Sequence, residues 1–99
     1  VKLYLVNGQC NVSATNFPYV QGYVQFKRDA TILIQYSLSI TVENASATAD
    51  PNLQLPSSCL LFLDTPSSGT YTYTVQVKVQ DSSNTAFITN VRLVAEELI

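Results

Sequence analysis

The sequence predicts an all-β protein, an antiparallel β-sandwich of about eight strands. Two patterns support this prediction: several stretches alternate strictly between apolar and polar residues, and turn-forming residues separate these stretches at short intervals. The composition agrees, because 46% of the 99 residues are hydrophobic and only 12% are charged, so neutral polar side chains must cover the solvent-facing surfaces. The number and spacing of the strands suit a jelly roll or an immunoglobulin-like sandwich. The length fits a single domain spanning residues 1–99.

The strands are expected, in chain order, near residues 2–6, 9–15, 22–27, 31–42, 53–55, 59–64, 69–80 and 85–97. The strands over 31–42 and 69–80 have the clearest alternation, which is typical of a strand with one buried face. Leu33 alone interrupts the polar side of the first of these, and Asn90 is a candidate break in the last strand. Turns are expected at the following groups: Asn7-Gly8, Phe17-Pro18 with Gln21-Gly22, Lys27 to Asp29, Pro66 to Gly69, and Asp81 to Asn84.

Three short strands are apolar on both faces, near residues 2–6, 59–63 and 91–95. A small two-layer fold covers only one face of each strand, so the second apolar face needs another cover. We therefore expect the chain to associate with copies of itself. The alternative is that these are central strands whose second face is shielded by loops. The expected interface residues are Tyr4, Leu61, Leu63, Val94 and Leu98.

The two cysteines, Cys10 and Cys59, are expected to be reduced thiols, because a single pair is a weak disulfide signal in a chain with an adequate core. The immunoglobulin signature requires a Trp between two cysteines and a Tyr two places before the second. This sequence has no Trp, and Ser57 occupies the Tyr position. The immunoglobulin-like alternative is therefore rejected.

Nothing in the sequence indicates catalysis or metal binding, and we expect no catalytic residue, metal or cofactor. There is no His, and no Ser-x-x-Lys motif that could activate a nucleophile. Asp50, Asp64 and Asp81 lie in expected turns, where carboxylates commonly bond nearby backbone amides. The two matches to the glycosylation acceptor pattern, at Asn11 and Asn44, are attributed to chance in a Ser- and Thr-rich chain.

The net charge of -2 offers no basic surface for nucleic acid or an anionic membrane, so neither is an expected partner. No apolar run approaches the length of a membrane span, and the first residues lack the order of a secretory signal. One group of aromatic residues has a candidate binding role. Phe17, Tyr19 and Tyr23 flank a Gly- and Pro-marked stretch that is expected to be a loop. These aromatic residues would suit a sugar or protein partner, and the alternative is that they close an end of the barrel.

The final two-thirds of the chain resembles a known family. Its features are an alternating strand over 31–42, the run Leu60-Leu61-Phe62-Leu63-Asp64, the Pro-x-x-Gly-Thr-Tyr-x-Tyr-x-Val segment over 66–75, and the closing Arg92 to Leu98. This order is similar to the compact tumour-necrosis-factor/C1q-like jelly rolls of tailed bacteriophages, in which the last strand runs through the centre of the sandwich. The first 30 residues are compatible with that family without being distinctive.

The resemblance implies a TNF-like jelly roll that forms a homotrimer about a threefold axis and performs no chemistry. It implies a virion protein, assembled in the host cytoplasm and located on the capsid exterior or on a fibre. A capsid decoration or cement protein bound to the major capsid protein or another virion protein is preferred, because no shaft-like sequence precedes the first strand. The alternative is a fibre head that binds a host-surface glycan or receptor, and a small hydrolase is a distant third.

Overall fold

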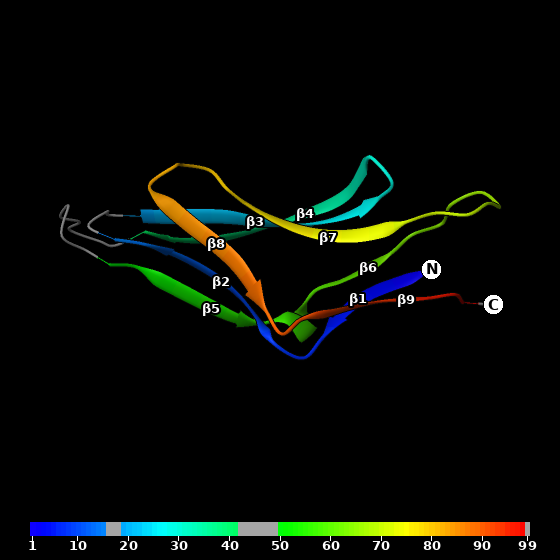
Figure 1. Cartoon of the computed structure of the whole chain (residues 1–99), viewed down its shortest axis with the longest axis horizontal. Coiled ribbons are helices and arrows are strands. Elements are labelled where there is room, and N and C mark those ends of the chain that lie inside the picture. The colour runs from blue at the N-terminus through cyan, green and yellow to red at the C-terminus, as the bar shows by residue number, and fades with distance from the viewer. Residues whose placement is uncertain (16–18, 42–49, 99) are drawn as a thin grey trace.

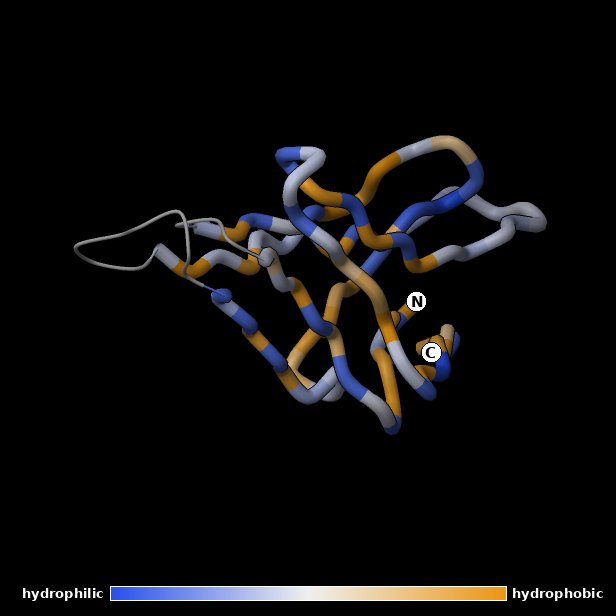
Figure 2. The backbone as a smooth tube through the Cα atoms, turned by 60° about the vertical axis from the view of Figure 1, so that its left-hand side comes forward, coloured by the Kyte–Doolittle hydropathy of each residue, from blue (hydrophilic) through white to orange (hydrophobic). Residues whose placement is uncertain are grey.

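The structure is a computed structural model that describes residues 1–15, 19–41 and 50–98, and it is all-β (Figure 1). Hydrophobic and hydrophilic residues alternate along its strands (Figure 2). The strands form three antiparallel three-stranded sheets with the orders β6-β1-β9, β5-β2-β8 and β4-β3-β7. The elements are β1 (Lys2–Val6), β2 (Gln9–Ala14), β3 (Tyr19–Arg28), β4 (Thr31–Thr41), β5 (Asn52–Pro56), the 3-10 turn η1 (Ser57–Cys59), β6 (Leu61–Leu63), β7 (Tyr73–Val79), β8 (Asn84–Thr89) and β9 (Arg92–Glu96).

Two of the three sheets are successive parts of the same three chain segments. β1 leads into β2, β5 leads through η1 into β6, and β8 leads into β9, and each set of neighbours keeps the same order in both sheets. The segments bend at one level, so the two half-sheets form the arms of a V in Figure 1. The bend is marked by positive φ angles at Asn7, Gly8 and Asn90, of 61°, 63° and 54°. Asn and Gly tolerate this backbone region, which explains their presence there.

Gly8 is required at the bend for a second reason. A Cβ atom added to Gly8 would lie 1.9 Å from the carbonyl oxygen of Thr89, on the neighbouring segment. The bend therefore depends on a close approach of two backbones that only glycine permits. Ser57 also joins the segments here, because its hydroxyl donates a hydrogen bond to the carbonyl of Asn7.

The sheet β4-β3-β7 lies across the bent sheet, and the core fills the space between these two layers (Figure 1). β3 is the central strand of this sheet, and its inward side chains Val20, Val24 and Phe26 are fully buried. At Gly22 the layers come especially close, since a Cβ atom there would lie 2.4 Å from Cγ1 of Val12. The other buried apolar residues are Leu3, Leu5, Cys10, Val12, Ala14, Leu38 and Leu60.

The expected strands are found, with three corrections to their bounds. β3 begins at Tyr19 because Gly22 lies inside the strand, where it accommodates Val12, and does not form a turn. β7 begins only at Tyr73, so residues 69–72 precede it. Cys59 belongs to η1 instead of opening a strand. The expected final strand is divided at Asn90 into β8 and β9, as the sequence suggested.

A β-bulge accounts for the interruption of the alternation at Leu33. Phe26 pairs with Ile34, whereas Lys27 pairs with Ile32, so the register shifts by one residue on β4. Ile32 is consequently paired with Lys27 and is 52% exposed. The alternation expected over residues 31–42 was therefore wrong at Ile32, because an extra residue in one strand reverses the alternation beyond it.

Candidate functional site

Four apolar residues gather on the outward side of the half-sheet β6-β1-β9, which we call the apolar outer face: Tyr4, Leu61, Leu63 and Val94. The strand register places Leu61 and Val94 on either side of Tyr4, and Leu63 beside Lys2 in the next row. Side chains paired in this way point to the same side of a sheet. Leu61 and Leu63 are 47% and 59% exposed, so large apolar groups meet solvent here.

The three strands of this half-sheet are the three whose sequences are apolar on both faces. Leu93 pairs with Leu5 and packs against the core, whereas Val94 pairs with Tyr4 on the opposite side. β9 therefore has one side that packs against the core and one side that points outward. Charged side chains border the patch: the Lys2 ammonium lies 5.1 Å from the centre of the Tyr4 ring, and the Tyr4 hydroxyl donates a hydrogen bond to Glu96.

The other arm of the bent sheet has a polar outer side. Asn11, Ser13 and Thr85 occupy outward positions on β2 and β8, with Gln54 beside Asn11 on β5. Phe87 is the one large apolar residue among the exposed ones on that arm, at 43% exposure. The bend thus divides one sheet into a polar half and an apolar half, although the same three chain segments build both.

Leu98, the fifth expected interface residue, is not part of the apolar outer face. It lies beyond the end of β9, is 52% exposed, and lines a pocket at the end of the molecule. The sequence could not separate Leu98 from the other four residues, because its position depends on where β9 ends. The strand ends at Glu96, so the alternation that places Val94 does not extend to Leu98.

Tyr19 and Tyr23 lie on a strand, so the expected binding loop was wrong in its structure. Both belong to β3, four residues apart, and Phe17 lies outside the described residues. Tyr23 pairs with Lys78, and the Lys78 ammonium lies 5.6 Å from the centre of the Tyr23 ring. The Tyr23 hydroxyl donates a hydrogen bond to the Gln80 side chain. Tyr19 is 38% exposed at the start of the strand. These tyrosines belong to the largely polar outer surface of β4-β3-β7.

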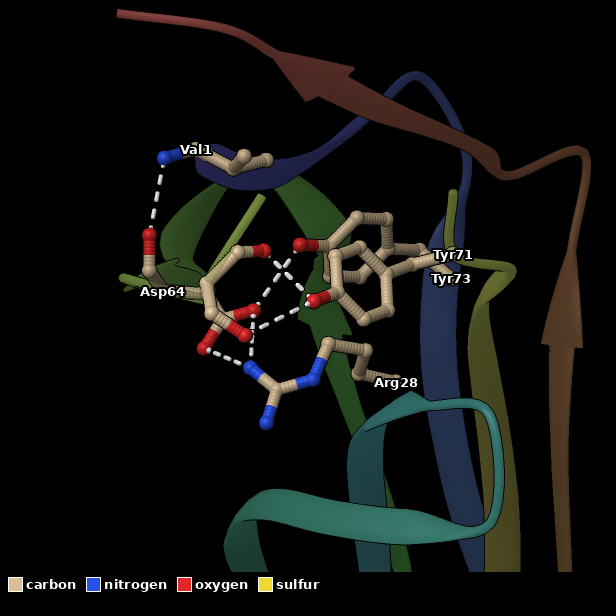
Figure 3. A network of polar contacts seen from close by, with 6 residues as sticks. Val1, Arg28, Asp64, Tyr71 and Tyr73 are labelled. Atoms are coloured by element: carbon tan, nitrogen blue, oxygen red, sulfur yellow. Dashed lines mark hydrogen bonds and ion pairs between the residues drawn. The ribbon is translucent and has the colours of Figure 1, made fainter. Parts of the chain in front are cut away.

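The most extensive polar network joins the two layers (Figure 3). Arg28, at the end of β3, forms an ion pair with Asp64, with its Nη1 atom 2.7 Å and 2.8 Å from the two carboxylate oxygens. The Tyr73 hydroxyl donates a hydrogen bond to the same carboxylate at 2.8 Å, and the Val1 nitrogen donates to the Asp64 carbonyl oxygen. The Asp64 residue is buried and fully paired.

Burial raises the pKa of the Asp64 carboxyl, but the hydrogen bonds from Arg28 and Tyr73 outweigh it, so the pKa lies below its ordinary value. For Tyr73, burial and the Asp64 carboxylate both raise the pKa of the hydroxyl. The expected role of Asp64 in capping its own turn was incomplete, because its main partner is 36 residues away. The sequence offers one signal for this role, which is the opposite charge of Asp64 and the distant basic pair Lys27-Arg28.

A pocket of about 470 Å³ lies at the end of the molecule, next to this network. Its walls come from the segment 64–69 that follows β6, from Tyr71 and Tyr73, and from Ala95, Glu97 and Leu98 at the end of β9. Tyr71 holds the segment in shape, because its hydroxyl donates a hydrogen bond to the Ser67 carbonyl. Its ring also lies 5.4 Å from the Arg28 guanidinium. No pattern in the sequence pointed to this pocket.

The remaining candidate residues have structural contacts. Cys10 is buried and Cys59 is exposed, and no disulfide joins them in the structure. Asn11 is buried, and its amide donates a hydrogen bond to the Asn52 side chain, so the first glycosylation match is not accessible. Asp81 accepts a hydrogen bond from the Ser83 backbone, the expected turn role.

Among the residues that the structure describes, no group of three or more His, Cys, Asp or Glu side chains could hold a metal ion. No helix in the same part of the chain is long and apolar enough to cross a membrane. Comparisons with protein-family models, with curated proteins and with solved structures find no match. The family resemblance therefore stays a prediction from the sequence.

Proposed function

We propose that this chain is a non-enzymatic structural subunit of a virion, a capsid decoration or cement protein that forms a homotrimer and binds the outer surface of a phage head. The observation that carries the proposal is the apolar outer face, confined to one arm of a sheet whose other arm is polar. Exposed apolar residues that are contiguous on one face are characteristic of interaction surfaces.

The shape of the subunit supports the same proposal. Its radius of gyration is 15.4 Å, whereas a compact chain of about 100 residues has a value of about 13 Å. The molecule is elongated, with extents of 51 × 24 × 18 Å. An elongated subunit exposes more surface for its mass than a compact one, and association with copies of itself would cover the apolar part of that surface.

The jelly-roll path is part of the proposal. The first described segment, 2–14, pairs with the last one, 84–96, and β3 pairs with β7. Such nested pairing results when a long antiparallel hairpin is wrapped around a core, as in a jelly roll. The threefold state and the binding of a major capsid protein come from the family resemblance, and the outer face supplies a surface on which copies of the subunit would meet.

The alternative function is a fibre head that binds a host-surface glycan or receptor. The pocket at the end of the molecule favours this alternative, because a fibre head needs a site that recognises a ligand on the host surface. Both functions share the trimer and the virion location, so the apolar outer face does not distinguish between them.

Electron microscopy of native particles labelled with an antibody against this chain tests the proposal. Regularly spaced label over the capsid lattice is the expected result, because a decoration protein occupies equivalent positions on the head. Label confined to fibre ends would support the alternative function, and particles that lack the chain altogether would contradict both.

A further inference from the structure

We propose that the pocket at the end of the molecule binds a neutral saccharide unit. The site is separate from the apolar outer face and is contained within a single subunit, so this inference does not depend on the proposed trimer. Its volume of about 470 Å³ lies within the range of about 300 to 1,000 Å³ that is usual for small-molecule sites.

The pocket is pre-formed by contacts on both sides of the 64–69 segment. Asp64 is held at one end by Arg28 and Tyr73, and Ser67 is held by the Tyr71 hydroxyl. A binding site whose walls are already ordered loses less conformational entropy when a ligand binds. The fixed segment therefore supports a site for a rigid ring more than a site for a flexible peptide.

The lining selects hydroxyl-rich, uncharged ligands. The side chains of Thr65, Ser67 and Ser68 supply hydroxyl groups that both donate and accept hydrogen bonds. The charged groups of the lining are the Val1 ammonium, which donates a hydrogen bond to the Asp64 carbonyl oxygen, the Asp64 carboxylate, which Arg28 neutralises, and the Glu97 carboxylate, to which no ion pair occurs among the described residues. The Val1 and Glu97 charges are opposite, so the lining has no net charge that would attract an ion, whereas a sugar hydroxyl can donate to the Glu97 carboxylate.

One part of the wall is apolar and suits the carbon-bound hydrogens of a sugar ring. Pro66, Ala95 and Leu98 contribute this part. Ala95 pairs with Leu3 and therefore points to the inward side of its sheet, yet Ala95 is exposed because the two layers open at this end. A pyranose offers polar hydroxyls at its edge and apolar faces, and the mixed lining matches both.

Nuclear magnetic resonance of the ¹⁵N-labelled protein tests the proposal. The probes are the methyl glycosides of glucose, galactose and N-acetylglucosamine, with the anionic methyl glycoside of N-acetylneuraminic acid for comparison. We expect at least one neutral glycoside to cause saturable shifts in the amides of residues 64–71 and 97, with an affinity in the millimolar range. The anionic glycoside should bind more weakly, and Glu97→Gln should reduce this difference because it removes the charge.

Two matched variants locate the site. Ser68→Trp places a large side chain in the pocket without removing a member of the Arg28 network, and it should weaken binding about tenfold or more. Ser82→Trp makes the same change in the exposed turn between β7 and β8, and it should leave binding unchanged. The proposal is overturned if no neutral glycoside gives saturable shifts in residues 64–71. It is also overturned if the shifts lie around Tyr19 and Tyr23, or if Ser68→Trp binds as well as Ser82→Trp.

Discussion

Asp64 joins the two layers of the molecule at the pocket end. Its carboxylate is the shared acceptor of Arg28, from β3, and Tyr73, from β7, while its own segment follows β6. Removing one partner of a buried ion pair leaves the other charge without compensation, which is costly. The network is therefore expected to stabilise the fold when Arg28, Asp64 and Tyr73 are all present. Loss of any one of the three should lower the stability.

The lowered pKa of Asp64 gives stability a dependence on acid pH. Because the folded-state pKa lies below the unfolded value of about 3.9, the stabilisation is fully present above that value and is lost as the pH falls through the folded pKa. We expect Asp64→Asn to lower the free energy of unfolding by about 1 to 3 kcal/mol at pH 7. We also expect the variant to lose less stability than the unmodified protein as the pH falls below about 5. The difference between the two losses should again be about 1 to 3 kcal/mol.

Urea unfolding followed by circular dichroism at several pH values measures this effect. Asp81→Asn is the matched control, because Asp81 lies in the turn between β7 and β8 and the variant retains the Asp64 network. Its loss of stability in acid should follow that of the unmodified protein. If Asp64→Asn and Asp81→Asn lose stability equally as the pH falls, the ion pair does not carry the acid dependence.

At the scale of single residues, the sequence was informative where the chemistry is local. The turn role of Asp81 and the positive φ at Asn7 and Gly8 follow from side-chain type and immediate neighbours. The partnership of Arg28 with Asp64 could not be predicted, because it depends on how strands distant in the chain are brought together. The pocket was missed for the same reason, since its walls come from three separate segments.

The contact between β2 and β3 depends on one glycine. Gly22 faces Val12 so closely that an added methyl group would overlap Cγ1 of Val12, which is fully buried. We expect Gly22→Ala to lower the free energy of unfolding by about 1 to 3 kcal/mol, the usual cost of overpacking a core. Val12→Ala alone should also destabilise the protein, because it leaves a cavity.

The double variant separates this cause from a general loss of stability. In Gly22→Ala/Val12→Ala the new methyl group occupies the space that the valine vacated, so the combined loss should be smaller than the sum of the two single losses. Chemical denaturation of all four proteins supplies the cycle. Additive losses would show that the two residues do not pack against each other as the structure describes.

The bounds of β1 and β4 were predicted accurately, whereas β7 begins at Tyr73 and not at residue 69, where its alternation starts. β4 was predicted almost completely, because a long half-buried strand has a strong pattern. The sequence failed where tertiary contacts override a local signal: Gly22 resembles a turn residue but lies inside β3, and the bulge at Leu33 turns Ile32 outward. It also could not show that the three doubly apolar strands form one half-sheet, which is the finding that gives them a common outer face.

The molecule is an elongated two-layer structure in which two exposed leucines, Leu61 and Leu63, lie together on one arm of the bent sheet. The fold class was predictable, because composition and alternation both indicate an all-β chain. We propose that subunits associate through the apolar outer face, because Tyr4, Leu61, Leu63 and Val94 lie on one side of three neighbouring strands.

Two variants test where subunits meet. Leu63→Asp introduces a charge on the apolar outer face, at a residue exposed enough that the subunit should still fold. Phe87→Asp makes an equivalent change on the polar arm, at a residue of comparable exposure. Only Leu63→Asp should weaken association, because a carboxylate that is solvated in the free subunit would be desolvated when subunits pack together. Circular dichroism verifies that both variants retain their β-structure.

Sedimentation equilibrium of the unmodified protein and these two variants at micromolar concentration tests the proposed association through the apolar outer face. The unmodified protein and Phe87→Asp should have three times the 10.9 kDa mass of the chain, and Leu63→Asp should shift toward the mass of a single chain. An unmodified protein that remains a monomer throughout this range, or a Leu63→Asp variant that stays as fully associated as Phe87→Asp, would contradict it.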